Sequence, residues 1–126
     1  MLGPMIASAL QMVAAFNLVC AGTVRTGPLG LALPERDGTP FAITYRIDLD
    51  SNRWCSDACD AIEPVALVLD GQIVLREQYN PDGSRVVMVS PATRRFTDTL
   101  IAGNTATLRS GVCTAAPFTG FPLRVA

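Results

Sequence analysis

The four cysteines of the chain, Cys20, Cys55, Cys59 and Cys113, are its most reactive side chains. Cys55 and Cys59 flank the polar stretch Ser56-Asp57-Ala58, whose composition is typical of a turn. A catalytic redox pair is normally spaced Cys-x-x-Cys beside a helix N-terminus, and structural zinc sites use paired knuckles of the same spacing. The sequence has neither pattern, so we predict a structural disulfide between Cys55 and Cys59. Cys20 and Cys113 then pair by elimination, which staples the two ends of the chain together.

Acidic residues lie on both sides of the pair Cys55 and Cys59. The stretch Asp48-Leu49-Asp50-Ser51-Asn52 begins like an EF-hand calcium loop, but Arg53 replaces the glycine that such a loop needs. We therefore interpret this stretch as a hairpin turn. Paired carboxylates can also hydrolyse glycosides, provided that a cleft raises the pKa of one of them. We expect no such cleft around three further acidic residues, which are predicted to lie on solvated turns: Asp57, Asp60 and Glu63.

The composition removes most catalytic chemistry. The chain has no His, and all 10 of its Lys and Arg residues are Arg. It therefore lacks an imidazole for general base catalysis, an amine for a Schiff base and a histidine ligand for zinc. We expect no enzyme activity, no cofactor and no metal site. The net charge of −1 also argues against nucleic-acid binding, although Arg85 and Arg94-Arg95-Phe96 could contact a phosphate.

The N-terminal stretch predicts export. Residues 5–16 are an apolar run with two polar interruptions, and no charged side chain occurs before Arg25. The run is shorter than the about 20 residues that a membrane span needs, and its length fits the apolar region of a signal peptide. The expected location is the periplasm or the exterior, with no integral membrane segment in the mature chain.

The small residues of Val13-Ala14-Ala15 suit cleavage before Phe16. We therefore predict a signal peptide over 1–15 and one exported β-domain over 16–126. Two alternatives stay open. One is a lipid anchor on Cys20, and the other is a cytosolic protein in which the apolar run is a buried helix.

The clearest strand signal is the stretch from Phe41 to Leu49, in which apolar and polar side chains alternate. Further strands are expected at 16–24, 53–55, 65–69, 72–77, 84–90, 94–101 and 105–110, and a long loop at 26–39. Turn residues separate these strands, and no long helical period follows Phe16. The sequence therefore predicts an all-β fold, a small antiparallel β-barrel or β-sandwich of seven to eight strands stapled by disulfides.

The strongest hairpin signal is Asp70-Gly71, which suits a type I′ turn between two apolar stretches. A two-residue loop pairs Leu67 with Val74 and Val68 with Ile73. Because both faces of this hairpin are apolar, we expect it at the centre of the sheet.

Several stretches together resemble a set of small, uncharacterised exported bacterial proteins. They are the opening Phe16–Thr23, the strand Tyr45–Leu49 with Trp54-Cys55 and Cys59 after it, and Gly111-Val112-Cys113 ahead of Pro117-Phe118. The resemblance implies export and β-structure and carries no activity.

A more distant resemblance is to the periplasmic inhibitors of C-type lysozyme. Those inhibitors are small exported β-barrels in which a disulfide ties an early strand to the C-terminus, and a Ser-Gly-rich loop before a Tyr plugs the lysozyme cleft. The comparable stretch here, Pro81–Arg85, lacks that loop motif.

These observations favour a monomeric, non-catalytic exported β-domain that binds a protein partner or supports the cell envelope. An inhibitor of an envelope-directed hydrolase and a lipocalin-like carrier of a small apolar ligand are the alternatives. A partner is expected to contact the predicted loop residues Tyr79, Asn80, Asp82, Ser84 and Arg85.

Overall fold

The computed structural model describes residues 14–30 and 38–123. All the regular secondary structure in these residues is β-strand. The predicted signal peptide therefore lies outside the described residues except for Ala14 and Ala15. The strands are β1 (Ala15–Pro28), β2 (Thr39–Asp48), β3 (Arg53–Ser56), β4 (Glu63–Pro64), β5 (Leu67–Leu69), β6 (Gln72–Asn80), β7 (Gly83–Ser90), β8 (Arg95–Ala102) and β9 (Thr105–Pro117).

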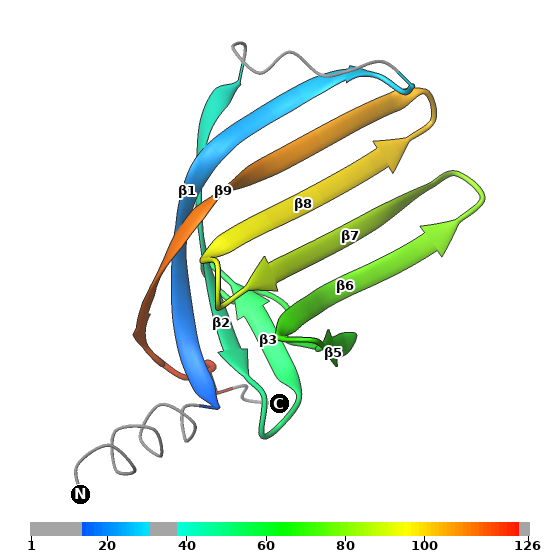
Figure 1. Ribbon diagram of the computed structural model, residues 1–126. Coiled ribbons are helices and arrows are strands. Elements are labelled where there is room, and N and C mark those ends of the chain that lie inside the picture. The colour runs from blue at the N-terminus through cyan, green and yellow to red at the C-terminus, as the bar shows by residue number, and fades with distance from the viewer. Residues whose placement is uncertain (1–13, 31–37, 124–126) are drawn as a thin grey trace, which may run out of the picture.

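Within these residues the nine strands form one antiparallel sheet, in the order β4-β3-β2-β1-β9-β8-β7-β6-β5. The long strands β1 and β9 bend, and the sheet curls into a half-barrel (Figure 1). The prediction of an antiparallel, barrel-like all-β fold is confirmed. The predicted count of seven to eight strands is wrong, because the additional strand β4 has only 2 residues and leaves no alternating pattern in the sequence.

The strands β1 and β9 approach closely where Gly22 pairs with Gly111. A Cβ on Gly22 would overlap the backbone of Ser110, so no larger residue fits there. Cys20 and Cys113 form a directly opposed pair nearby, with their Cα atoms 3.9 Å apart, and are joined by a disulfide. The predicted stapling of the two ends of the chain is thus present between adjacent strands.

One end of the half-barrel is closed by the chain between β4 and β5. The amide of Val65 donates to the carbonyl of Asn52 at 3.1 Å, and the amide of Ala66 donates to the carbonyl of Val74 at 2.9 Å. An ion pair between Glu63 and Arg76 adds a link from β4 to β6. We call this the closed end. The opposite end, which carries the β6–β7 and β8–β9 turns, is called the open end (Figure 1).

The core fills the concave, inner face of the sheet from the closed end. Tyr45 and Ile47 of β2 are fully buried, while Phe41, Ile43 and Leu49 pack against the core at its margin. The alternation predicted for residues 41–49 is therefore confirmed. The other buried members of the core are Phe16, Leu18, Cys20, Trp54, Val65, Ile73, Leu75, Val87, Val89, Phe96 and Cys113.

The hairpin at Asp70-Gly71 has the predicted register but not the predicted position. Leu67 pairs with Val74 and Val68 with Ile73, and both turn residues have positive φ as a type I′ turn requires. The expectation of a central hairpin is wrong, because β5 is an edge strand. Its side chains Leu67, Val68 and Leu69 are 48%, 51% and 58% exposed. An apolar pattern on both faces does not distinguish a central strand from a short edge strand, because the pattern carries no information on which strand lies alongside.

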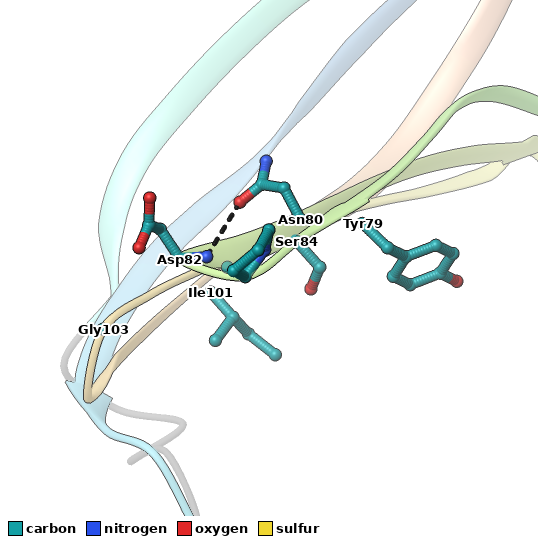
Figure 2. Close-up of a pocket in the computed structure, with 8 residues that line it drawn as sticks. Tyr79, Asn80, Asp82, Ser84, Ile101 and Gly103 are labelled. Atoms are coloured by element: carbon teal, nitrogen blue, oxygen red, sulfur yellow. Dashed lines mark hydrogen bonds between the residues drawn. The ribbon is translucent and has the colours of Figure 1, made fainter.

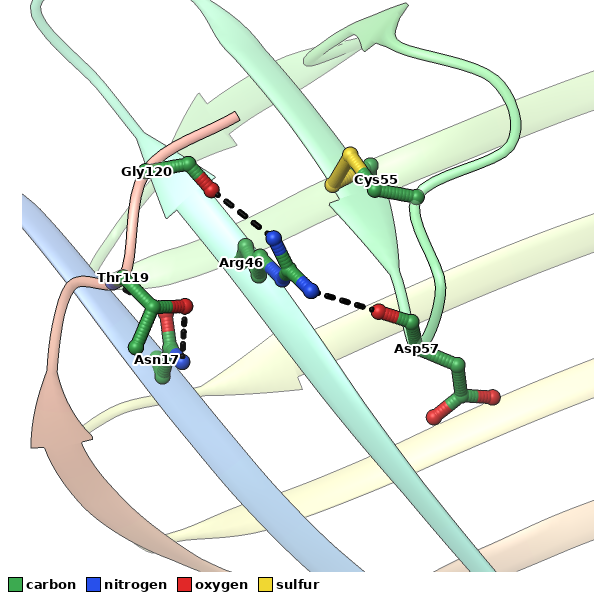
Figure 3. Close-up of a disulfide and its surroundings, with 7 residues drawn as sticks. Asn17, Arg46, Cys55, Asp57, Thr119 and Gly120 are labelled. Carbon is green, nitrogen blue, oxygen red and sulfur yellow. Dashed lines mark hydrogen bonds between the residues drawn. A yellow bond between two sulfur atoms is a disulfide. The ribbon is translucent and has the colours of Figure 1, made fainter. Parts of the chain in front are cut away.

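The C-terminal stretch after β9 crosses the convex, outer face of the sheet (Figure 3). The Asn17 side-chain amide donates to the Thr119 hydroxyl at 3.0 Å, and Arg46 Nη1 donates to the carbonyl of Gly120 at 3.0 Å. The rings of Phe118 and Phe121 meet edge to face at 5.2 Å between centroids. This segment therefore covers the face opposite the core.

Candidate functional site

The disulfide between Cys55 and Cys59 is present, with a Cα–Cα distance of 5.0 Å. Its loop is fixed to β2 through Asp57, whose Oδ1 accepts the amide of Thr44 at 3.0 Å while its own carbonyl accepts Arg46 Nη2 at 2.9 Å (Figure 3). This corner is thus held by structural contacts on the outer face.

Among the acidic residues around the Cys55–Cys59 pair, Asp48, Asp57 and Glu63 have separate structural partners. Asp48 Oδ1 accepts the amides of Asp50 and Ser51, at 3.0 and 3.4 Å, which caps the β2–β3 turn. Glu63 pairs with Arg76. Over residues 14–30 and 38–123, no three Asp, Glu, Cys or His side chains gather in a way that could hold a metal ion.

The predicted partner residues lie on the β6–β7 hairpin, and four of the five line one surface hollow. Tyr79 is 69% exposed and points away from the turn (Figure 2). Asn80 Oδ1 accepts the amide of Asp82 at 3.1 Å, and the amide of Gly103 donates to the carbonyl of Asp82 at 3.1 Å. The turn is therefore tied to the neighbouring β8–β9 turn. It borders a surface hollow of about 560 Å³, lined by Tyr79, Asn80, Pro81, Asp82, Gly83, Ser84, Ile101 and Gly103.

Arg85 turns away from this hairpin surface and into a charged cluster on the inner face. Its Nε donates to Asp98 Oδ1 at 3.2 Å and its Nη2 to Asp98 Oδ2 at 2.9 Å. Arg109 Nη1 donates to the same Oδ2 at 3.3 Å. The Asp98 side chain is only 1% exposed, whereas those of Arg85 and Arg109 are 32% and 30% exposed. The three strands β7, β8 and β9 thus place two guanidinium groups on one buried carboxylate.

Cross-strand register explains how these residues meet. Asp98 pairs with Val87 on one side and with Arg109 on the other. Val87 belongs to the core, so its cross-strand partners share the inner face. Arg85 precedes Val87 by one strand period and points the same way.

Tyr45 lies beneath this cluster. Its ring packs edge to face on Phe96 and Trp54, with centroids 6.1 Å away in both cases. Burial, with the nearby charge of Asp98, raises the pKa of Tyr45 well above its ordinary value. The hydrogen bond to Asp98 similarly raises the pKa of Arg85. Neither the Tyr45 hydroxyl nor Arg109 Nε, both buried, has a hydrogen-bond partner in the described part of the chain.

A second cavity, of about 310 Å³, lies beside the cluster toward the open end. Arg76 lies at one side of it, paired with Glu63 and stacked over the Trp54 ring at 5.7 Å. Gln78, which pairs with Arg85 across the strands, is exposed in it. Its lining consists of Arg76, Gln78, Asn80, Asp82, Gly83, Ser84, Arg85, Leu100, Ile101 and Ala102.

Sequence reasoning did not find the cluster of Asp98, Arg109 and Tyr45. A signal was present in the stretch from Phe96 to Leu100, where Asp98 takes an apolar position of the alternation. A charge at such a position predicts a buried ion pair. Its partners, however, come from strands whose register is fixed only in the folded sheet.

Comparison of the chain with known protein families, with curated proteins and with solved structures gives no match. A search of residues 14–30 and 38–123 for a helix long and apolar enough to cross a membrane also finds none.

Proposed function

We propose that this chain is an exported, non-catalytic domain that binds a partner protein along the free edge of β6 and at the β6–β7 hairpin. The observation that carries the proposal is the unequal pairing of β6. On one side β7 pairs with it as far as Asn80, whereas on the other β5 reaches only from Gln72 to Val74. Among the described residues no strand pairs with 76–80 on that side.

A free strand edge offers backbone donors and acceptors to an extended segment of another protein. Tyr79 stands at this edge with its ring in solvent, and tyrosine is among the residue types enriched at binding hot spots. The hairpin turn is anchored to the β8–β9 turn, so a partner would meet a surface that is already ordered.

The two disulfides support export, because such bonds persist in oxidising compartments. Intact mass spectrometry of the native protein tests it. We expect a chain that starts at Phe16 and carries two disulfides. A full-length chain with free thiols contradicts export. Cleavage at that point would also remove the bond in which the carbonyl of Ala14 accepts the amide of Leu49 at 2.8 Å.

Partner binding is tested by placing a photo-crosslinking amino acid at position 79 in the producing cells, with position 112 as the control. Val112 is 54% exposed but lies on the paired strand β9. We expect a foreign protein joined at position 79 only, and slower hydrogen exchange of amides 76–80 when that protein is added in purified form. Equal cross-linking at both positions, a product joining two copies of this chain, or unchanged exchange would each contradict the proposal.

A hydrolase inhibitor is the second candidate, favoured by the projecting, ordered hairpin with its exposed Tyr79. We expect added protein to slow lysis of bacterial cells by a C-type lysozyme, and Tyr79→Ala to weaken inhibition at least about tenfold. Val112→Ala serves as the control. Undiminished lysis at an excess of protein rejects this candidate. The packing of the interior does not favour a carrier of an apolar ligand, because side chains such as Tyr45 and Phe96 fill the concave face.

A further inference from the structure

The charged cluster on the inner face has more hydrogen-bond donors than acceptors. The Asp98 carboxylate accepts the bonds from Arg85 Nε, Arg85 Nη2 and Arg109 Nη1. Among the buried atoms of this cluster, Arg109 Nε and the Tyr45 hydroxyl have no hydrogen-bond partner within residues 14–30 and 38–123. Buried donors without acceptors are destabilising. The cluster therefore has fewer hydrogen-bond acceptors than its buried donors need.

The net charge of the cluster also favours an anionic ligand. Two arginines share one aspartate, so Arg85, Asp98 and Arg109 together carry one net positive charge. Asp98 holds each guanidinium by one edge only, and the fork of a guanidinium binds an oxyanion through two parallel N–H groups. The side chains of Arg85 and Arg109 are 32% and 30% exposed, so a solute can reach both from solvent.

The cavity of about 310 Å³ leads to Arg85 and has a second cation at its other side. Gln78 pairs with Arg85 and Arg76 with Val87, so Arg76 and Arg85 are diagonal neighbours across β6 and β7. Such neighbours are about 7–8 Å apart. Leu100 and Ala102 add aliphatic surface to the lining between these polar groups and the β8–β9 turn.

We propose that this cavity is a binding site for a short aliphatic dicarboxylate. One carboxylate accepts hydrogen bonds from the Arg85 guanidinium, and the other lies against Arg76 and Gln78. The methylene groups between them contact Leu100. The site goes beyond partner binding, because it uses the inner face and does not depend on the edge of β6 being occupied.

The test is a titration of the full chain with succinate, followed through the Nε–H resonances of its arginines by NMR. We expect saturable shifts at Arg85 and Arg76, which line the cavity, and little shift at Arg95, which is exposed at the start of β8. Acetate at the same concentration should bind at least about tenfold more weakly, since it fills only one of the two positions. Sodium chloride at matched ionic strength reports the effect of screening alone.

Gln78→Glu is the informative variant, because it puts a carboxylate opposite Arg85 without removing any contact of Asp98. We expect it to raise the dissociation constant for succinate at least about tenfold through repulsion and competition. Gln72→Glu makes the same change on the same strand outside the cavity and should leave binding unchanged. Arg85→Lys, which loses the fork, should also weaken binding.

The proposal is overturned if succinate gives no saturable shift, if chloride reproduces the shifts, or if the two glutamate variants bind succinate equally. It can fail while cross-linking at position 79 succeeds, so its fate is separate from that of the proposed partner binding.

Discussion

The closed and open ends of the half-barrel use the same strands in opposite ways. On β7 the inner face changes from Val87 to Arg85 within one strand period, and on β8 it changes from Phe96 to Asp98. The apolar half gains stability from burial. The charged half must desolvate its ions, and apolar side chains of similar size would often serve stability as well or better. The comparison therefore suggests that the closed end keeps the protein folded, while the open end is kept charged for binding.

The largest expected effect is at the disulfide that joins β1 to β9. Its sequence separation is 93 residues, against 4 for the disulfide of the outer corner. By loop-closure entropy, replacing Cys20 and Cys113 with Ser should lower the free energy of unfolding by about 4–5 kcal/mol. Replacing Cys55 and Cys59 should cost about 2 kcal/mol. Urea unfolding of the two double variants measures both values. Equal losses of stability would show that the length of the loop closed by each disulfide does not determine its contribution.

Asp98→Ala should have the next largest effect, about 3–5 kcal/mol of lost stability, because it leaves two guanidinium groups without their shared carboxylate. The measurement is again urea unfolding. Asp70→Asn is the control. It keeps a residue type that tolerates the positive φ of that exposed turn position, and it should change stability by less than about 0.5 kcal/mol. A loss at Asp98 no larger than that of the control would mean that the cluster is not part of the folded interior.

Replacing the whole cluster separates stability from binding. The triple variant Arg85→Met, Asp98→Leu, Arg109→Met removes every charge together, so it should recover most of the stability that Asp98→Ala loses. It should nevertheless lose succinate binding. A triple variant that is as unstable as Asp98→Ala would contradict the division of labour between the two ends.

The raised pKa of Tyr45 should give a smaller effect, a loss of stability at high pH. Its pKa is raised in the folded state, so above the ordinary tyrosine pKa of about 10 the unfolded chain loses its proton while the native chain keeps it. Stability is therefore unaffected below that pH and falls as the pH rises above it. In a Tyr79→Phe variant, which leaves Tyr45 as the only tyrosine, tyrosinate absorbance should appear only with unfolding. Ionisation of Tyr45 in the folded protein would contradict its burial.

The smallest effect is expected at the edge strand β5. Val68 is 51% exposed, so Val68→Thr should change stability by less than about 0.5 kcal/mol. Val87→Thr, the same substitution in the core, should cost several times more because it buries a hydroxyl. Similar losses of stability at the two sites would support the central position that the sequence predicts for β5.

The sequence-based prediction succeeded where the signal is local. The alternation of residues 41–49 indicates one buried face, Asp70-Gly71 specifies a hairpin register, and four cysteines on short strands indicate two disulfides. The placement of β5 failed because edge or centre depends on strands that are distant in sequence. The cluster of Arg85, Asp98 and Arg109 was missed for the same reason, since its members come from three strands whose inner faces are defined only by their mutual register.

Hydrogen exchange of the native protein tests most directly whether β6 offers a free edge at the open end. We predict that among amides 76–80 those facing away from β7 exchange rapidly. Amides of β1 and β9 around Cys20 and Cys113, which lie between paired strands, should exchange only through global unfolding. Uniform strong protection along β6, equal to that of β1, would contradict the account, because it would show that the edge is already paired.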